Sequence, residues 1–389
     1  MIYVSVDNDH HSRLLLDLLN KYQVASDEIT FISHISPRNR ILINENPPQI
    51  KVMGHPLSSG MGYRNFKTYV LSYIHYFKLR SKFAFKKDDV LIIATEYQLN
   101  NAFLAKWMSK IGGLVYLFDE GIGFYFNNSA FHHGRISLKD RWYLLLYKLA
   151  FSITLIPAYP RKGFEGRMFS CIDDRFVDGV YSRMRLPIDR PLKIFGYRNL
   201  LDDVQAEQNK DVGCVLVFGG NLTSFGVGDE ERVVMRKVIE DLSRKFKKVL
   251  IKIHPGDAVS RSGNYDFFHQ IIQEHENVSE VDNFITGNEA IKSYRPKIVI
   301  GALGATLFDS IFFGCQPIFL FHLLPSAPEF KVCEFFLNNL NYKFIKNIDD
   351  IGPDYSSGLD PAKLLFVESE KMPWELIKNS SFEKISEAD

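Results

Sequence analysis

Two adjacent carboxylates, Asp119 and Glu120, follow directly on the short apolar run 114–118, and Gly121 comes next. A run of apolar, β-branched and aromatic residues of this length predicts a buried strand. In an open α/β sheet, ligands bind just beyond the carboxyl ends of the strands, where a carboxylate can remove a proton from a substrate hydroxyl. Gly121 permits a sharp turn there, because it has no side chain to clash. A solvent-exposed acidic loop is the alternative interpretation.

A histidine occupies the matching place after a second apolar run, 248–253. Pro255 follows His254 and restricts the backbone where the chain leaves this predicted strand. A histidine held in this way can stabilise or protonate a departing phosphate. Taken alone, His254 would equally suit a structural role.

Small residues at two further strand ends are candidates for binding an anion through backbone N–H groups. The turn 301–306 opens a predicted helix, and the first N–H groups of a helix are free to bind phosphate. It is not a P-loop, since no Lys-Ser/Thr pair follows its glycines. The turn 219–221 is a weaker candidate for contacts with a donor phosphate or sugar. The candidate residues in these turns are Gly219, Gly220, Asn221, Gly301, Gly304, Ala305 and Thr306.

The elements that would position these residues alternate between strands and helices, which predicts parallel sheets. In the first half, the predicted strand 89–95 and helix 98–111 precede the acidic strand. In the second half the predicted strands are 213–218, 248–253, 278–281, 298–300 and 316–320, and the predicted helices are 229–246, 265–274, 288–293 and 307–313. Between 134 and 197 the pattern is irregular.

A polar, charged segment, 202–211, separates the two halves. We therefore predict an α/β fold of two Rossmann-like parallel-sheet domains, 1–201 and 212–389, that face a central cleft. The first would serve the acceptor side and the second would bind the donor. The remainder after the last predicted strand looks helical and is expected to pack back on the first domain.

Composition excludes several classes of protein. The 389 residues are 46% hydrophobic and 24% charged, as in ordinary globular proteins, and the net charge of +1 argues against nucleic acid as a partner. Four scattered cysteines without a CxxC pair indicate a reduced, cytoplasmic chain without a zinc site. No signal peptide is expected. The longest apolar stretch, 142–156, predicts a buried helix running into a strand, with a membrane-interface segment as the alternative.

Two further segments have open interpretations. Residues 62–87 carry seven Lys and Arg, no acid, and aromatic residues at helical spacing. This pattern suits a core-facing aromatic stripe with a solvated basic back, or a surface for an anionic glycan or lipid head groups. Asp7-Asn8-Asp9 matches a DxD metal-binding pattern, but the pattern is short and follows the first strand, so no metal site is expected.

The order and spacing of Asp119-Glu120-Gly121, His254-Pro255 and the turn 301–306 resemble bacterial sialyltransferases of GT-B type. These enzymes share a D/E-D/E-G motif, an HP motif and a motif of paired hydroxyls. The stretch 118–125 is most similar to the capsular polysialyltransferases and the related lipooligosaccharide sialyltransferases. The third motif departs from the family, since Ala305-Thr306 stands where the family has two hydroxyl residues.

The resemblance implies a GT-B fold and an inverting, metal-independent transfer of sialic acid, or a related nonulosonate, from its CMP-sugar. The acceptor would be a capsular, lipooligosaccharide or glycolipid glycan. Glu120 would be the general base, His254 would engage the donor phosphate with Thr306, and Asp119 would orient the loop. No cofactor is implied, because the CMP-sugar is a substrate, and peripheral contact with the inner membrane is expected. The alternatives are a CMP-Kdo or CDP-glycerol transferase, or a non-catalytic glycan- or lipid-binding subunit.

Overall fold

A computed structural model gives the fold. It describes residues 1–6, 12, 15–16, 24, 26–33, 50–52, 70, 74, 77–78, 80–94, 99–118, 138–151, 156–157, 169–170, 174–182, 192–196, 210–220, 228–260, 263–302, 304–324, 337, 340–359 and 375.

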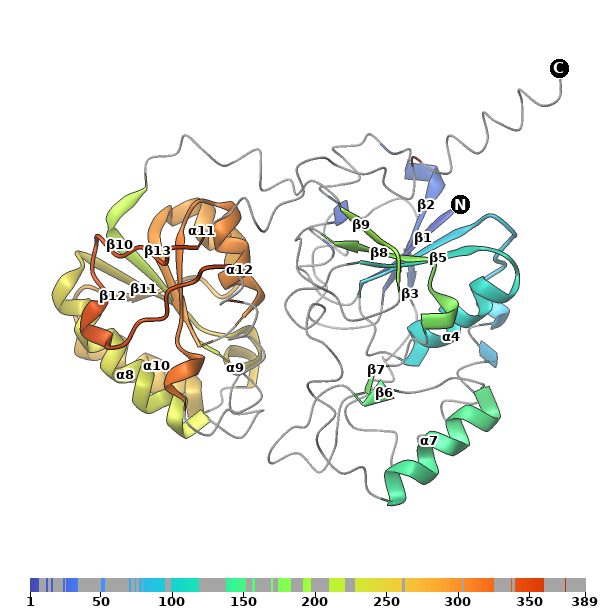
Figure 1. Ribbon diagram of the computed structural model, residues 1–389, viewed down its shortest axis with the longest axis horizontal. Helices are drawn as coiled ribbons and strands as arrows, with labels where there is room; N and C mark the ends of the chain where they lie inside the picture. Colours follow the sequence, from blue (N-terminus) through green and yellow to red (C-terminus); the bar gives the residue numbers. More distant parts are fainter. Residues whose placement is uncertain are drawn as a thin grey trace.

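The first domain is built on a seven-stranded sheet whose strand pairs are all parallel (Figure 1). In order across the sheet the strands are β3 (Ile50–Val52), β2 (Ile29–Ser33), β1 (Ile2–Val6), β4 (Val90–Ile93), β5 (Leu114–Phe118), β8 (Gly179–Ser182) and β9 (Ile194–Gly196). Helix α4 (Leu99–Lys110) connects β4 to β5 and packs on both. Strands buried on both faces carry continuous apolar runs, and the four side chains of β4 are all fully buried.

The second domain holds a five-stranded parallel sheet. In order its strands are β12 (Val278–Glu280), β11 (Lys248–Lys252), β10 (Asp211–Phe218), β13 (Pro296–Gly301) and β14 (Gln316–Phe319). Its helices are α8 (Gly228–Lys245), α9 (Pro255–Ser260), α10 (Gly263–Glu274), α11 (Gly287–Tyr294) and α12 (Ala305–Phe312). The predicted alternation of strands and helices in this half is present, with α9 as an additional short helix. β10 begins at Asp211, and most of the segment 202–211 lies outside the described residues.

The stretch 134–197 contains the helix running into a strand that the apolar residues 142–156 predicted. The helix is α7 (Leu138–Phe151), and the two-residue strands β6 (Ile156–Pro157) and β7 (Phe169–Ser170) pair antiparallel after it. The prediction that this helix is buried is wrong for the side chains that the structure describes, because Trp142 and Leu149 are exposed. The pattern of apolar residues predicted a helix face correctly, but no described element covers that face.

Residues 340–359, after β14, differ from the helical remainder that the sequence suggested. The described residues 340–359 contain one short 3-10 helix, η7 (Ile348–Asp350), and otherwise irregular backbone. They pack on the second domain, where the Tyr342 hydroxyl accepts a hydrogen bond of 3.0 Å from the Phe319 N–H. Apart from 375, the residues after 359 lie outside the described part of the chain. The other 3-10 helices are η1 (Ser26–Glu28), η2 (Asp174–Phe176) and η5 (Phe321–Leu323).

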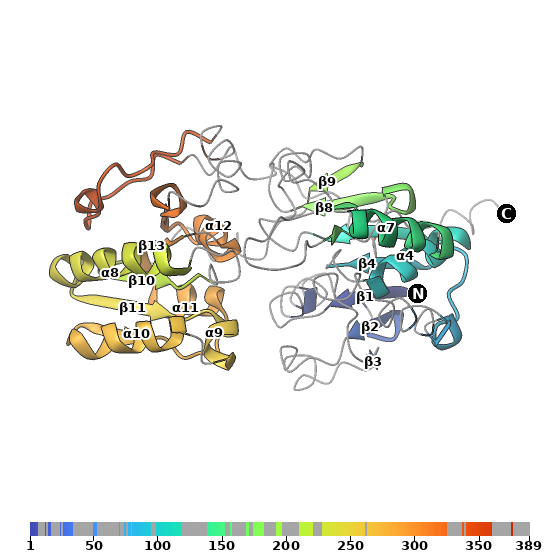
Figure 2. The same ribbon diagram turned by 90° about the horizontal axis from the view of Figure 1, so that it is seen from below.

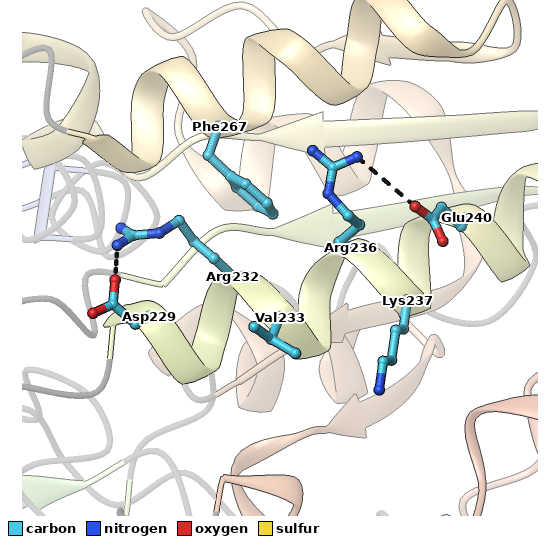
Figure 3. A pocket seen from close by; sticks show the side chains of 7 residues that line it. All are labelled: Asp229, Arg232, Val233, Arg236, Lys237, Glu240 and Phe267. Carbon is cyan, nitrogen blue, oxygen red and sulfur yellow. Dashed lines mark hydrogen bonds and ion pairs between the residues drawn. The ribbon is translucent and has the colours of Figure 1, made fainter.

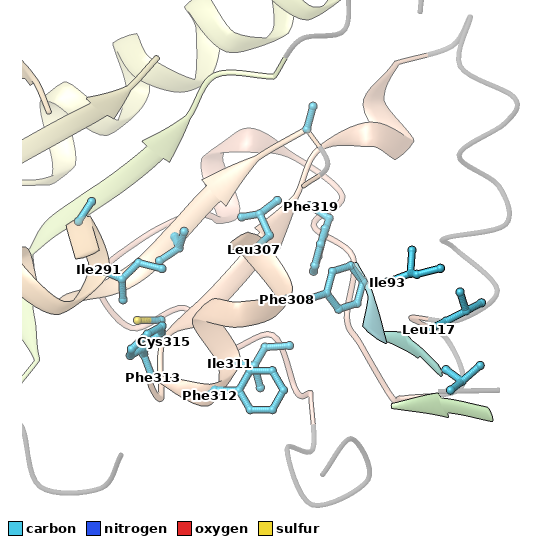
Figure 4. Close-up of a cluster of buried hydrophobic side chains, with 14 of the residues drawn as sticks. Ile93, Leu117, Ile291, Leu307, Phe308, Ile311, Phe312, Phe313, Cys315 and Phe319 are labelled. Carbon is cyan, nitrogen blue, oxygen red and sulfur yellow. The ribbon is translucent and has the colours of Figure 1, made fainter. Parts of the chain in front are cut away.

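Helix α12 is apolar around most of its circumference and is buried. Leu307, Phe308 and Phe312 are each 1% exposed, and the Phe308 ring lies 4.8 Å from the ring of Phe319 on β14. The same hydrophobic cluster contains Ile93 of β4, so it includes buried residues of both domains (Figure 4). The core therefore holds the helix that begins at the end of the 301–306 segment.

The two domains lie side by side, and α9 and α12 lie on the side of the second domain that faces the first (Figure 2). Both helices follow the carboxyl ends of strands in the second sheet. Among the helices of the described residues, none combines the length and the hydropathy that crossing a membrane would require.

Candidate functional site

The carboxyl edge of the second sheet brings three of the predicted segments together. Phe218, the last residue of β10, pairs with Lys252 on one side and with Gly301 on the other. The N–H of Gly219 donates a 3.0 Å hydrogen bond to the carbonyl of Lys252. The turn that begins at Gly219 therefore leaves the sheet between His254 and the segment that opens α12.

His254 is oriented by backbone contacts on both its carbonyl and its ring. Its carbonyl accepts hydrogen bonds of 2.9 and 3.0 Å from the N–H groups of Asp257 and Ala258, so it caps α9. Pro255 is the first helical residue, a position where proline is favoured because it has no N–H to leave unpaired. The Gly256 N–H donates a 3.0 Å hydrogen bond to the imidazole Nδ1. In the neutral ring the proton is therefore on Nε2, which can donate it to an anion.

A buried network that the sequence did not reveal fixes the Gly219-Gly220 turn. The Gly220 N–H donates to Glu231 Oε1 at 2.8 Å, and the Asn264 side-chain amide contacts the Gly220 carbonyl at 3.4 Å and Asp257 Oδ2 at 3.5 Å. Glu231, Asn264 and Asp257 are at most 3% exposed. Helices α8, α9 and α10 thus hold one turn. An acid in the first turn of a helix is common, because it interacts favourably with the helix dipole. The position of Glu231 in the sequence therefore does not predict its contact with Gly220.

At two positions of this edge, neighbouring side chains leave no room for a Cβ atom, so glycine is required. A Cβ on Gly219 would lie 2.7 Å from Cε2 of Phe268, a ring that is 1% exposed and cannot move aside freely. A Cβ on Gly287, the first residue of α11, would lie 2.6 Å from Cγ2 and 2.9 Å from Oγ1 of Thr306. The Thr306 side chain therefore rests on the backbone of Gly287, which sets the position of its hydroxyl.

The Gly287→Ala substitution is expected to raise the donor KM by about tenfold, because it pushes away the Thr306 hydroxyl and one hydrogen bond to a charged group is lost. The start of α11 cannot yield easily, since Thr286 and Glu289 form a capping box around it. Steady-state kinetics with varied donor would measure the effect.

The matched control is Gly352→Ala, where an added Cβ meets nothing within 4 Å. Alanine favours a helix over glycine by about 1 kcal/mol, so Gly287→Ala should not lower stability through helix propensity. An unchanged donor KM in Gly287→Ala would contradict the role given to Thr306.

Lys252 adds a buried cation to the same edge. Its side chain is 3% exposed, and Nζ lies 3.4 Å from Oδ1 of Asn283. Burial lowers the pKa of the ammonium group, and the carboxylates of Asp282, Glu280 and Glu289 oppose that shift. Nearby carboxylates favour the charged form of a buried lysine.

The acidic motif and one turn residue cannot be compared with the structure. Asp119, Glu120, Gly121 and Asn221 lie outside the described residues, as does the Asp7-Asn8-Asp9 segment. β5 ends at Phe118 and lies between β4 and β8, so the acidic motif begins where an interior strand of the first sheet ends. In the second domain, Gly304 is the N-cap of α12 and Ala305 its first residue.

A surface hollow of about 540 Å³ lies away from these segments, between α8 and α10 (Figure 3). It is lined by Asp229, Arg232, Val233, Arg236, Lys237, Glu240 and Phe267. Its arginines are engaged, since Arg232 pairs with Asp229 and also donates a 2.7 Å hydrogen bond to Asn264 Oδ1. Of the predicted site residues that the structure describes, none lines this hollow, so the hollow is not the candidate site.

The sequence relationship is decided by a family match over most of the chain. Residues 2–320 match the sequence model of the family described as alpha-2,8-polysialyltransferase (POLYST). The chain belongs to this family. No curated protein matches the sequence. Membership in the alpha-2,8-polysialyltransferase family makes the chain a glycosyltransferase, with a nucleotide-sugar donor and a glycan acceptor.

Similar solved structures show the fold of this family member. The UDP-GlcNAc 2-epimerase of Methanocaldococcus jannaschii has a TM-score of 0.50 and 10% identity, covering 98% of this chain and 99% of the epimerase. The wall teichoic acid polymerase TagF, as its H444N variant, has a TM-score of 0.50 and 11% identity, covering 99% of this chain and 89% of TagF. These likenesses confirm the predicted GT-B architecture of two parallel-sheet α/β domains.

Proposed function

We propose that this polysialyltransferase family member transfers sialic acid, or a related nonulosonate, from its CMP-sugar to a surface glycan. The reaction would invert the anomeric carbon and need no metal ion or cofactor. The observation that carries the proposal is the Gly256–His254 hydrogen bond, which makes Nδ1 an acceptor and so favours the proton on Nε2 at a strand-end edge. A neutral N–H donor suits a leaving group that becomes a phosphate with additional negative charge.

The proposed reaction has one displacement. The acceptor hydroxyl oxygen attacks the anomeric carbon, the bond from that carbon to the phosphate oxygen breaks, and CMP departs. Glu120 takes the hydroxyl proton, and Asp119 orients its loop. His254 Nε2–H, the Thr306 hydroxyl and the N–H groups of the 301–306 turn bind the phosphate. Attack from the face opposite to CMP inverts the configuration.

The turn 219–221 would complete the donor site beside His254. Its Gly219 and Gly220 are held in place by Phe268 and by the Glu231–Asn264 network. We propose that the acceptor is a capsular, lipooligosaccharide or glycolipid chain, met by a cytoplasmic protein at the surface of the inner membrane.

Donor choice is tested by thermal unfolding with CMP-sialic acid, CMP-Kdo and CDP-glycerol. The matching donor at about 100 times its Kd should stabilise the fold by about 2.7 kcal/mol, and the others should do less. CMP release with a sialylated acceptor should then proceed unchanged in excess EDTA.

Each departure has a defined meaning. If only CDP-glycerol or only CMP-Kdo stabilised the fold, that compound would be the donor in place of CMP-sialic acid. Loss of activity in EDTA would contradict the metal-independent mechanism and direct attention to Asp7-Asn8-Asp9. Donor binding without CMP release on any acceptor would favour a non-catalytic subunit.

A further inference from the structure

Helix α7 presents an apolar stripe to solvent. Leu138, Trp142, Leu145 and Leu149 are 84%, 59%, 43% and 71% exposed. They are spaced four, three and four residues apart, which places them on one face of the helix. A stripe of this spacing ordinarily faces a protein core. Here it lacks any cover from the described part of the chain, and an exposed patch of this kind marks an interaction site.

A second segment of the first domain repeats the pattern. Val70, Ile74 and Phe77 are 37%, 46% and 50% exposed, and they too are four and three residues apart. Of the twelve large apolar side chains that are exposed among the described residues, seven belong to these two segments. The exposed apolar surface is therefore concentrated in the first domain, the side expected to receive the acceptor.

Both apolar stripes are accompanied by positive charge. Residues 62–87 contain seven Lys and Arg and no acid, and α7 contains Lys139, Arg141 and Lys148 against Asp140. Lys78, Arg80 and Lys82 are exposed beside the second stripe. The whole chain has a net charge of only +1, so this cationic character is local. Apolar side chains flanked by cations are complementary to a bilayer surface that contains anionic lipids.

We propose that α7 lies in the plane of an anionic lipid bilayer, with Trp142 and its neighbouring leucines inserted at the boundary between head groups and acyl chains. The exposed cations Lys78, Arg80 and Lys82 of the same domain would add electrostatic attraction to anionic head groups. An anionic glycan would neutralise the cations but leave the leucines and Trp142 in water. A second copy of α7 would cover the apolar stripe but bring like charges together. A bilayer accommodates both features, and tryptophan favours the membrane interface.

This membrane contact rests on the proposed function in one respect, namely that the acceptor is met at a membrane. Helix α7 is the surface that makes the contact.

The test is binding of the full chain to vesicles of phosphatidylcholine, alone or with an equal part of phosphatidylglycerol. The wild-type chain should bind the anionic vesicles, and high salt should weaken the binding. The double substitution Trp142→Ser and Leu149→Ser should lower affinity for anionic vesicles by at least about tenfold, because two inserted side chains are lost. The matched control is Val212→Ser with Val233→Ser, which removes two side chains that are 56% and 59% exposed in the second domain.

Quenching by lipids with brominated acyl chains gives a second readout. Brominated lipid should quench part of the tryptophan fluorescence in the wild-type chain. Trp142→Phe should abolish this quenching while vesicle binding persists. The proposal would be overturned if the double variant in α7 (Trp142→Ser with Leu149→Ser, the α7 pair) bound vesicles as well as the wild-type chain and the control double variant do. The proposal would also be overturned if the main effect of the α7 pair were to dissociate a dimer, or to abolish binding to soluble polysialic acid.

The two proposals fail separately. The α7 pair should transfer sugar to a soluble acceptor at the wild-type rate, because α7 lies outside the candidate catalytic residues. Vesicle binding without sialic acid transfer would overturn the proposed function alone. Transfer with no vesicle binding would overturn the membrane inference alone.

Discussion

The His254→Ala substitution is expected to lower kcat by about 10²–10³-fold while the protein stays folded, because a preorganised donor to the departing phosphate is lost. The charge on that phosphate grows as the bond breaks, so kcat should fall more than donor affinity. Initial rates of CMP release, with unfolding temperature as the check on folding, measure the effect.

The hydrogen bond from Gly256 to the imidazole Nδ1 allows a sharper comparison at this position. His254→Gln places an amide N–H near the former Nε2, whereas His254→Asn keeps a polar group only near Nδ1, the atom that accepts from Gly256. We expect His254→Gln to retain more activity than His254→Asn. The reverse order would mean that Nδ1, not Nε2, faces the substrate, and full activity in His254→Ala would remove the residue from the mechanism.

The Glu120→Gln substitution is expected to lower kcat by about 10²–10⁴-fold, because an amide cannot take the proton of the acceptor hydroxyl. Gln has nearly the same shape as Glu, so donor binding should change little. Measured from acid to neutral pH, the rate of the wild-type enzyme should rise as the base ionises, and the variant should lose this rise.

Asp119→Asn is the matched comparison, since it removes the neighbouring carboxylate at the end of β5. Its loss of activity should be smaller than that of Glu120→Gln if Asp119 only orients the loop. A larger loss in Asp119→Asn would exchange the two roles, and an unchanged pH profile in both variants would exclude the pair as the base.

Much of the second domain could be predicted from the sequence because its elements are locally encoded. The apolar run 248–253 became β11, and the periodic pattern 229–246 became α8 within one residue at each end. The carboxyl ends of these strands were sufficient to place His254 and the 301–306 turn at one edge. The segment around Glu231 and Asn264 gave no such signal, because each residue alone suits an ordinary helix surface. Their common contact with Gly220 arises from the packing of two helices.

The α7 helix shows what a periodic sequence pattern cannot predict. Its spacing of apolar residues predicts a helix with one apolar face, and such a face is normally buried. Periodicity reports which side chains share a face, but not what lies against it. The exposure of Leu138 and Leu149 could be learned only from the fold.

Local patterns in the sequence were enough to predict the parallel strands of both domains and the alternation that makes the GT-B fold, and they include the motifs that link this chain to the polysialyltransferases. These features follow from short-range periodicity and turn chemistry, which act within a few residues. The tertiary structure alone decided that β10 lies between β11 and β13, and so that Gly219 emerges between His254 and the start of α12. It also decided which imidazole nitrogen can donate and which helix face meets solvent, because those properties depend on contacts between residues that are brought together only when the chain folds.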